Sequence, residues 1–149
     1  MIIRKAISYE YPILIENESR VFDSDIITKE DCRNFNTYVL DDEEGNILGH
    51  YISYIEENSS YLFTILINGS YRGKGFSNLL LEHYLTQESL NHTLHVNIDN
   101  YVAIHLYESY DFRQINIIRH FYENGEDAIF MRRENENNPE ANLWRSRKF

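Results

Sequence analysis

The sequence predicts an α+β domain, a mixed β-sheet flanked by helices, and three observations carry this prediction. The 149 residues, of which 42% are apolar, suffice for one domain with one hydrophobic core. Residues 9–36 favour helix, whereas residues 36–67 are rich in β-forming residues and are divided by turn-forming runs. A helix-length segment separates the apolar strand at 61–67 from the strand at 93–98, so these two strands are expected to run parallel.

Local patterns place each element in turn. Pro12 lies near a helix start, and the run at 23–25 interrupts the first helical region. The turn-forming runs at 41–46 and 56–60 predict hairpins, so three antiparallel strands precede residue 68. The last of them is almost wholly apolar, which is typical of a central strand covered on both faces. The expected elements are strands at residues 2–6, 36–40, 47–55, 61–67, 93–98, 112–122 and 127–132, and helices within 9–36, at 76–87 and at 100–110.

Composition and charge exclude several classes of function. A formal net charge of −10 argues against a nucleic-acid partner. Cys32 is the only cysteine, which excludes an intrachain disulfide and a multi-cysteine zinc site, and the spacing of the histidines predicts no metal site. The charged first residues do not resemble a signal peptide and no run reaches membrane-spanning length, so we expect a cytoplasmic protein without membrane contact. One domain is expected over residues 1–133, followed by a polar tail at 134–149.

A basic turn with two glycines links the apolar strand at 61–67 to the helix at 76–87. Such a turn exposes backbone N–H groups to an anion at a helix N-terminus, and Arg72 and Lys74 add positive charge there. The alternative is that both are surface charges beside a turn. The spacing matches neither a P-loop nor a dinucleotide-binding fingerprint. The turn therefore predicts a site for a phosphorylated cofactor.

The order of elements and two motifs resemble the GCN5-related N-acetyltransferase (GNAT) family over residues 2–133. That family's acyl-CoA loop, (Gln/Arg)-x-x-Gly-x-(Gly/Ala), is matched by Arg72-Gly73-Lys74-Gly75-Phe76-Ser77, with Ser77 at the last small position. Its Asn-x-x-Ala-x-x-x-Tyr segment is matched by Asn100, Ala103 and Tyr107. Asn100 and Tyr107 are seven positions apart, which places both on one helix face. Asp111 replaces the usual glycine of the following turn, and Asp tolerates a left-handed backbone better than most residues.

The resemblance implies a sheet of about seven strands with about four helices, splayed between the fourth and fifth strands. It also implies acetyl-CoA as the acyl donor and no metal. The cofactor-binding residues that it implies are Ile65, Leu66 and Ile67 through their backbone, the loop Arg72, Gly73, Lys74, Gly75, Phe76 and Ser77, and Asn100 with Ala103.

Within the family the sequence is most similar to the enzymes that acetylate protein N-termini, including the ribosomal-protein alanine type. The segments 94–100 and 106–109, together with Phe121-Tyr122 and the residues that follow, carry this likeness. The likeness implies His95 as the general base, Tyr61 as a residue that shares this task, Tyr107 as the general acid and Tyr122 as a contact to the peptide. No segment between residues 21 and 27 matches a specificity loop, which leaves the peptide preference open.

Each catalytic assignment has a structural alternative. Tyr107 lies on an apolar helix stripe, where an aromatic side chain ordinarily fills a core. His95 lies in a strand, where a backbone carbonyl can satisfy the ring. A reference pKa near 6.5 suits His95 for base catalysis near neutral pH. A hydroxyl on such a stripe needs a hydrogen-bond partner, and for Tyr107 the candidates are Asn100 and the cofactor sulfur.

We expect an enzyme that transfers acetyl from acetyl-CoA to a protein or peptide N-terminal α-amine by direct attack in a ternary complex. Two alternatives stay open: a small-molecule or lysine amine acetyltransferase on the same scaffold, and a non-catalytic acyl-CoA-binding regulatory module. Either a monomer or a homodimer is compatible with the sequence.

Overall fold

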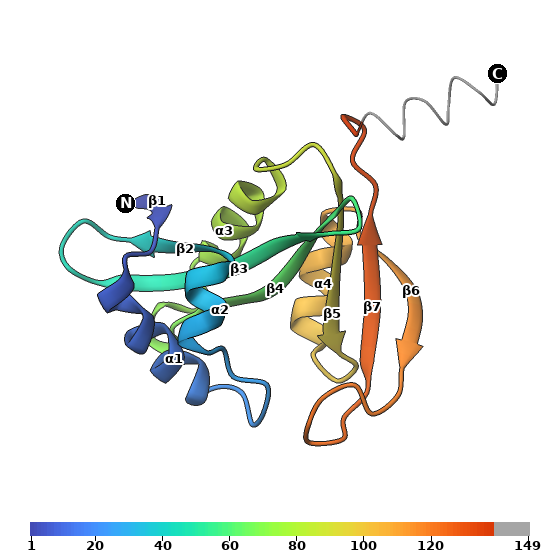
Figure 1. The fold of residues 1–149 in the computed structure, drawn as a ribbon, viewed down its shortest axis with the longest axis horizontal. Coiled ribbons are helices and arrows are strands. Elements are labelled where there is room, and N and C mark those ends of the chain that lie inside the picture. Colours follow the sequence, from blue (N-terminus) through green and yellow to red (C-terminus); the bar gives the residue numbers. More distant parts are fainter. Residues whose placement is uncertain (139–149) are drawn as a thin grey trace. The chain divides into compact units, whose positions relative to one another are not determined.

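The structure is a computed structural model that describes residues 1–138. Most of the expected polar tail, residues 139–149, lies outside the described residues. The elements are shown in Figure 1: β1 Ile2–Lys5, η1 Ser8–Glu10, α1 Tyr11–Ser19, α2 Lys29–Asn34, β2 Asn36–Asp41, β3 Ile47–Glu56, β4 Ser59–Ile67, η2 Gly69–Tyr71, α3 Phe76–Leu85, β5 Asn91–Asn97, α4 Tyr101–Ser109, β6 Arg113–Ile118 and β7 Ala128–Arg133.

The strands form a mixed sheet in the order β1-β2-β3-β4-β5-β7-β6. β4 and β5 pair in parallel, whereas β1 with β2, β2 with β3, and β7 with both β5 and β6 are antiparallel. The parallel register runs from Ser59 opposite Asn91 to Leu62 opposite Leu94. The predicted α+β fold, with seven strands and four α-helices within residues 1–138, is confirmed.

The chain divides into two compact units. Unit 1 comprises residues 1–54 and 63–84, and unit 2 comprises residues 55–62 and those from 85 onward. Strand β4 is shared, because its first four residues belong to unit 2 and the rest to unit 1. Unit 1 therefore contains the basic glycine turn, and unit 2 contains His95, Asn100 and Tyr107.

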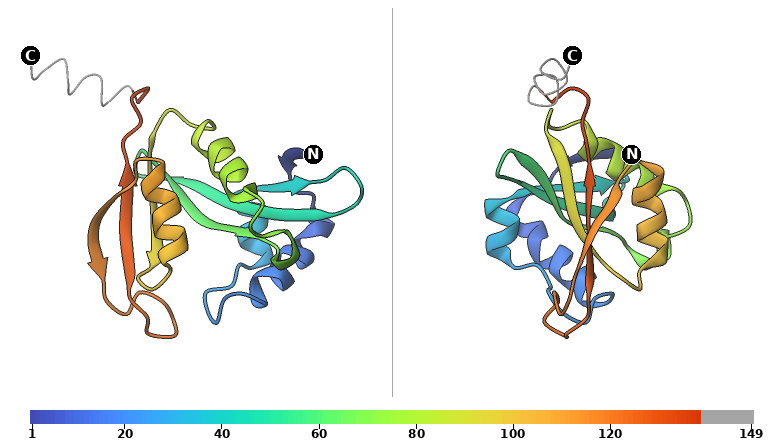
Figure 2. Two further views of the ribbon diagram at one scale, coloured as in Figure 1. Left: turned by 180° about the vertical axis from the view of Figure 1, so that it is seen from behind. Right: turned by 90° about the vertical axis from the view of Figure 1, so that its right-hand side faces the viewer.

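In unit 1, helices cover both faces of β2 and β3. Leu14, Ile27, Cys32, Val39 and Ile52 form a core beneath α1 and α2. The neighbouring Tyr51 points to the opposite face, where its hydroxyl lies 2.8 Å from His83 Nδ1 on α3. The right-hand view of Figure 2 shows α1 and α2 on one side of these strands and α3 on the other. Successive side chains of β3 point to opposite faces, so Ile52 packs beneath α1 and α2 while Tyr51 contacts α3.

A buried polar cluster joins α1 to the sheet in unit 1. Glu18 and His50 are 1% and 0% exposed, and Glu18 Oε2 lies 2.7 Å from His50 Nε2. The hydroxyl of Thr64 on β4 donates to the same carboxylate oxygen at 3.0 Å. The other ring nitrogen, Nδ1 of His50, is buried without a partner among residues 1–138. A buried carboxylate is tolerated here because two donors satisfy it.

In unit 2, α4 covers one face of β5 and β7, as the left-hand view of Figure 2 shows. Leu94 and Val96 of β5 lie opposite Met131 and Ile129 of β7 and are buried. The Tyr107 ring of α4 lies 5.7 Å from that of Phe112. Side chains alternate along β5, so Leu94 and Val96 lie on the core face and His95 lies on the other.

The turns account for how the chain reverses. Glu57 and Asn58 both have positive φ, which suits the two-residue hairpin between β3 and β4. Asp111 adopts φ +70°, so the left-handed turn expected from the family pattern is retained without glycine. Beyond β7, Asn135 is 8% exposed. Its backbone N–H donates to Asn91 Oδ1, and its side-chain Nδ2 donates to Glu88 O. The first residues of the expected polar tail are therefore anchored to unit 2.

Two strand predictions differ from the structure. Phe63 of β4 is 36% exposed, so this strand is not covered on both faces along its whole length. The strand expected at 112–122 ends at Ile118, and five of its six residues are exposed because β6 is the last strand in the sheet order. Phe121 and Tyr122 consequently lie in a turn instead of a strand.

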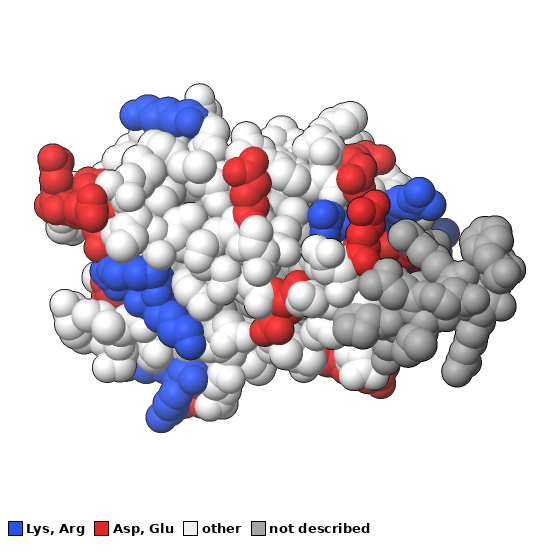
Figure 3. All heavy atoms as spheres, turned by 90° about the horizontal axis from the view of Figure 1, so that it is seen from above, with Lys and Arg blue, Asp and Glu red and all other residues white. Residues whose placement is uncertain are grey.

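Charged side chains are dispersed over the face shown in Figure 3. Acidic groups lie in several separate places with uncharged surface between them. The net charge of −10 therefore does not form one continuous field on this face. Among residues 1–138, no helix has the length and apolar character needed to span a membrane.

Candidate active site

The basic turn of unit 1 has the backbone that its glycines require. Gly73 and Gly75 have φ of +77° and +80°, in the region that glycine adopts most readily, and α3 begins directly afterwards at Phe76. A Cβ at either glycine would meet nothing within 4 Å, so the space beside the turn is open. The first N–H groups of an α-helix have no partner within the helix, and such groups can bind an anion. The turn therefore has the backbone that the predicted phosphate site requires.

Arg72 is attached to the end of β4. Its Nε donates to the carbonyl oxygen of Ile67 at 3.1 Å. A glycine on the neighbouring strand permits close approach here, because a Cβ at Gly49 would lie 2.5 Å from Leu66 O and 2.7 Å from Ile67 Cδ1. The segment 65–67 is thus held by β3 on one side and by the Arg72 side chain at its end.

His95 and Tyr61 form a hydrogen-bonded pair in unit 2. The Tyr61 hydroxyl lies 2.7 Å from His95 Nδ1. Phe121 stacks on the His95 ring at 4.1 Å with an interplanar angle of 13°, and Phe130 lies 5.0 Å away. Burial lowers the pKa of His95 below its ordinary value of 6.5, so the ring is neutral at pH 7. A neutral ring can accept a proton, as a general base requires.

The turn between β6 and β7 holds Phe121 in place. Tyr122 N donates to Glu126 O at 3.2 Å, and Gly125 N donates to Tyr122 O at 2.8 Å. The Glu126 carboxylate accepts hydrogen bonds from Asn97 and Asn124. The contact between Phe121 and His95 was not predicted from the sequence. The only sequence signal for Phe121 was that it is an aromatic residue next to Tyr122.

Tyr107 is 7% exposed on α4 and is protonated at neutral pH. Burial, with a smaller contribution from nearby Tyr122, raises its pKa well above the usual 10. Among residues 1–138, the structure gives its hydroxyl no hydrogen-bond partner, in contrast to the expectation that Asn100 could supply one. The Asn100 Oδ1 instead accepts from Ala103 N at 3.2 Å and caps α4, because an asparagine at a helix start ordinarily satisfies the helix's own N–H groups.

The other titratable residues within 1–138 do not gather into a metal site. Among the described residues, no group of three or more His, Cys, Asp and Glu side chains could hold a metal ion. Cys32 is buried in the core of unit 1, where burial raises the pKa of its thiol to about 11. A thiol with so high a pKa is a poor nucleophile at neutral pH.

Residues 9–135 match the family model of the acetyltransferase (GNAT) domain, so the chain belongs to this family. It is 28% identical over 111 residues to an N-alpha-acetyltransferase of Sulfolobus acidocaldarius. That match covers 63% of this chain and 66% of the relative, which is less than two thirds of the relative's length.

Solved structures share the fold. The ribosomal-protein-S18-alanine N-acetyltransferase from Escherichia coli is 25% identical with a TM-score of 0.77, covering 90% of this chain and 93% of that one. A spermidine N-acetyltransferase SpeG chimera from Vibrio cholerae and hSSAT has a TM-score of 0.75 at 18% identity, covering 91% and 97%. At such identity the second likeness concerns the fold alone.

Proposed function

We propose that the chain is an acetyl-CoA-dependent N-acetyltransferase that acts on the N-terminal α-amine of a protein or peptide. The observation that carries this proposal is the Tyr61–His95 pair, whose imidazole is neutral at pH 7. The likeness to an N-alpha-acetyltransferase and to a ribosomal-protein alanine N-acetyltransferase supports the choice of acceptor.

The basic turn and the strand before it would hold the cofactor. The main chain of 65–67 would meet the pantetheine arm, and the N–H groups of 73–77 with Lys74 would bind the pyrophosphate. Arg72 keeps the turn attached to β4 through Ile67. Asn100 and Ala103 begin the helix that carries Tyr107. When bound, acetyl-CoA would supply a thioester acyl group.

The chain's own residues would move two protons. The proton of the attacking amine passes to His95, either directly or through Tyr61 or a water, as the N–C bond forms. If the Tyr61 hydroxyl donates a hydrogen bond to Nδ1, then Nε2 carries the ring hydrogen and Nδ1 is the base. The amine proton then reaches Nδ1 through Tyr61. If Nδ1 carries the hydrogen, Nε2 is the base. The Tyr107 hydroxyl stays protonated and would donate to the departing sulfur. Tyr122 would contact the peptide.

His95 is a weak base, and this suits an α-amine acceptor. An α-amine of pKa about 7.7–8.0 is about a tenth neutral at pH 7, whereas a lysine amine near 10.4 is neutral at about four parts in ten thousand. The Glu126 carboxylate of unit 2 is already engaged by Asn97 and Asn124. A histidine with a tyrosine is therefore sufficient for an α-amine and poorly suited to lysine.

An acceptor panel tests this proposal. Acetyl transfer from acetyl-CoA is measured to peptides with a free N-terminus, to the same peptides with a blocked N-terminus and an internal lysine, and to spermidine. We expect transfer to the free N-termini, and turnover of spermidine without any peptide would refute it. Tyr107→Phe should slow transfer without abolishing CoA binding. CoA binding without any transfer by the wild type would instead indicate a binding module.

A further inference from the structure

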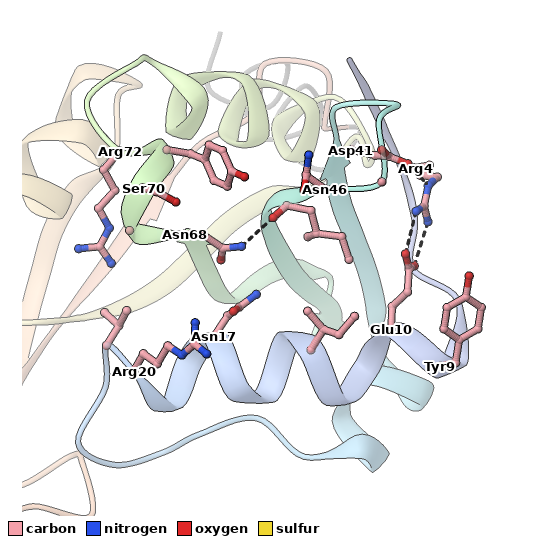
Figure 4. A pocket seen from close by; sticks show the side chains of 16 residues that line it. Arg4, Tyr9, Glu10, Asn17, Arg20, Asp41, Asn46, Asn68, Ser70 and Arg72 are labelled. Atoms are coloured by element: carbon pink, nitrogen blue, oxygen red, sulfur yellow. Dashed lines mark hydrogen bonds and ion pairs between the residues drawn. The ribbon is translucent and has the colours of Figure 1, made fainter.

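A cavity of about 770 Å³ lies within unit 1, between α1, the turn from β2 to β3, and residues 68–72. Figure 4 shows side chains from all three segments directed into it. Its volume falls in the range of small-molecule sites, about 300–1,000 Å³. None of the residues assigned to catalysis lines it.

One end of the cavity carries two arginines on opposite walls. Arg72 extends from the segment 68–72 and Arg20 extends from α1 (Figure 4). Arg72 uses only Nε, to bind Ile67 O, and its two terminal nitrogens have no partner among residues 1–138. Arg20 bonds Glu16 through one nitrogen in a surface pair whose side chains are 68% and 64% exposed. Such pairs are weak, and guanidinium groups bind carboxylates and phosphates through paired N–H groups. This end is therefore suited to an anion.

The middle of the cavity offers an acceptor that the protein does not use. Asn68 Nδ2 donates to Ile47 O at 2.7 Å, which fixes the amide, while its Oδ1 is buried without a partner among the described residues. A buried acceptor without a donor is costly, so a ligand with a donor group would be favoured here. Asn17 on α1 and Ser70 also line the cavity, and in the described part of the chain their side chains make no hydrogen bond.

The opposite end is closed to an anion. Arg4 donates to both oxygens of Glu10, at 2.9 and 2.8 Å, and to Asp41 at 3.0 Å. Two carboxylates thus surround its single positive charge, so this cluster repels a negative group and directs it toward Arg20 and Arg72.

We propose that this cavity binds a small organic anion that carries a phosphate or carboxylate together with a hydroxyl group. The anionic group lies between Arg20 and Arg72, and the hydroxyl donates to Asn68 Oδ1. The site is separate from acyl transfer, so it can exist whether or not the acceptor is an α-amine. It shares the segment 68–72 with the approach to the glycine turn, and for this reason the cofactor must be present in the test.

The test is calorimetric titration of the full chain, saturated with CoA, with 3-phosphoglycerate and with citrate. Arg20→Gln should raise the Kd at least tenfold, because it removes one of the two guanidinium groups. Asn17→Asp should abolish binding by placing a negative charge beside the anion. The matched control is Arg33→Gln, which removes an equally exposed arginine from the Glu30 pair on α2, outside the cavity, and should change the Kd less than twofold.

Thermal melting verifies that each variant is folded. Unchanged binding by Arg20→Gln would overturn the proposal, as would binding of neither compound by the wild type at 10 mM. Binding to the free chain that saturating CoA removes would also overturn it, because the anion would then occupy the cofactor site.

Discussion

Replacement of His95 by glutamine is expected to lower kcat/KM for a peptide with a free N-terminus about 10²-fold at pH 7. General-base catalysis contributes about 10²–10⁴-fold. The lower end applies because an α-amine of pKa near 8 is already about a tenth neutral at that pH. Glutamine is short enough for the site and polar enough to keep a bond to the Tyr61 hydroxyl, which lies 2.7 Å from His95 Nδ1. The fall in kcat/KM therefore measures the loss of the general base and not a disruption of the surrounding structure.

The pH dependence separates a base from a packing residue. At pH 9 the amine is about nine-tenths neutral without help, so the defect of His95→Gln should shrink about tenfold. In the wild type, kcat/KM should fall as the pH drops through the pKa of His95, which burial places below 6.5. The variant should lack this dependence on the histidine.

The assay is steady-state transfer between pH 5.5 and 9, with His105→Gln as the control. His105 is exposed on α4 in the same unit, and its replacement should leave kcat/KM within twofold. A His95→Gln enzyme with wild-type kcat/KM at pH 7 would refute the assignment of His95 as the base.

Three further predictions concern stability and the cofactor turn. Glu18→Ala should lower the free energy of unfolding by about 3–5 kcal/mol, because it leaves a buried histidine without its partner, whereas exposed Glu16→Ala should change it by less than about 0.5 kcal/mol. Equal urea midpoints would contradict this. Burial and the nearby Arg133 charge lower the pKa of His92 from 6.5 to about 4. Below pH 6.5 the unfolded chain binds this proton more readily than the folded protein. The free energy of unfolding should therefore be fully retained above pH 6.5 and fall by about 3 kcal/mol as the pH drops from 6.5 to 4. Urea unfolding across that range should show less loss in His92→Gln, and parallel curves would refute it. Gly75→Ala and Gly45→Ala each force a Cβ onto a positive φ and should each cost about 1–2 kcal/mol, but only Gly75→Ala should raise the KM for acetyl-CoA. An equal KM in both variants would exclude the turn from cofactor binding.

Patterns of a few residues predicted most of the backbone. The strand expected at 93–98, the helix expected at 100–110 and the left-handed turn at Asp111 are decided by neighbours in the chain, and all three are present in the structure. Errors arose where the environment decides. The exposure of Phe63 and the early end of β6 depend on which elements cover a strand, and no local pattern carries that information.

Long-range pairs in the candidate site could not be predicted in the same way. The likeness to a family placed Tyr61 and His95 in one task, but their 2.7 Å contact depends on the parallel register that sets Tyr61 opposite Thr93. The stacking of Phe121 on His95 depends on how the turn before β7 closes. Glu18 and His50 are 32 residues apart, and neither has a sequence signal of a buried pair.

The sequence by itself determined the order of strands and helices, the basic glycine turn, and the family to which the motifs point. Periodicity, capping and turn chemistry act over a few residues, so they can be read along the chain. Only the tertiary structure decided which side chains come together: His95 stacks with Phe121, Glu18 pairs with His50, and Arg20 and Arg72 line one cavity. These contacts depend on register and on packing between distant segments, which a linear pattern does not specify.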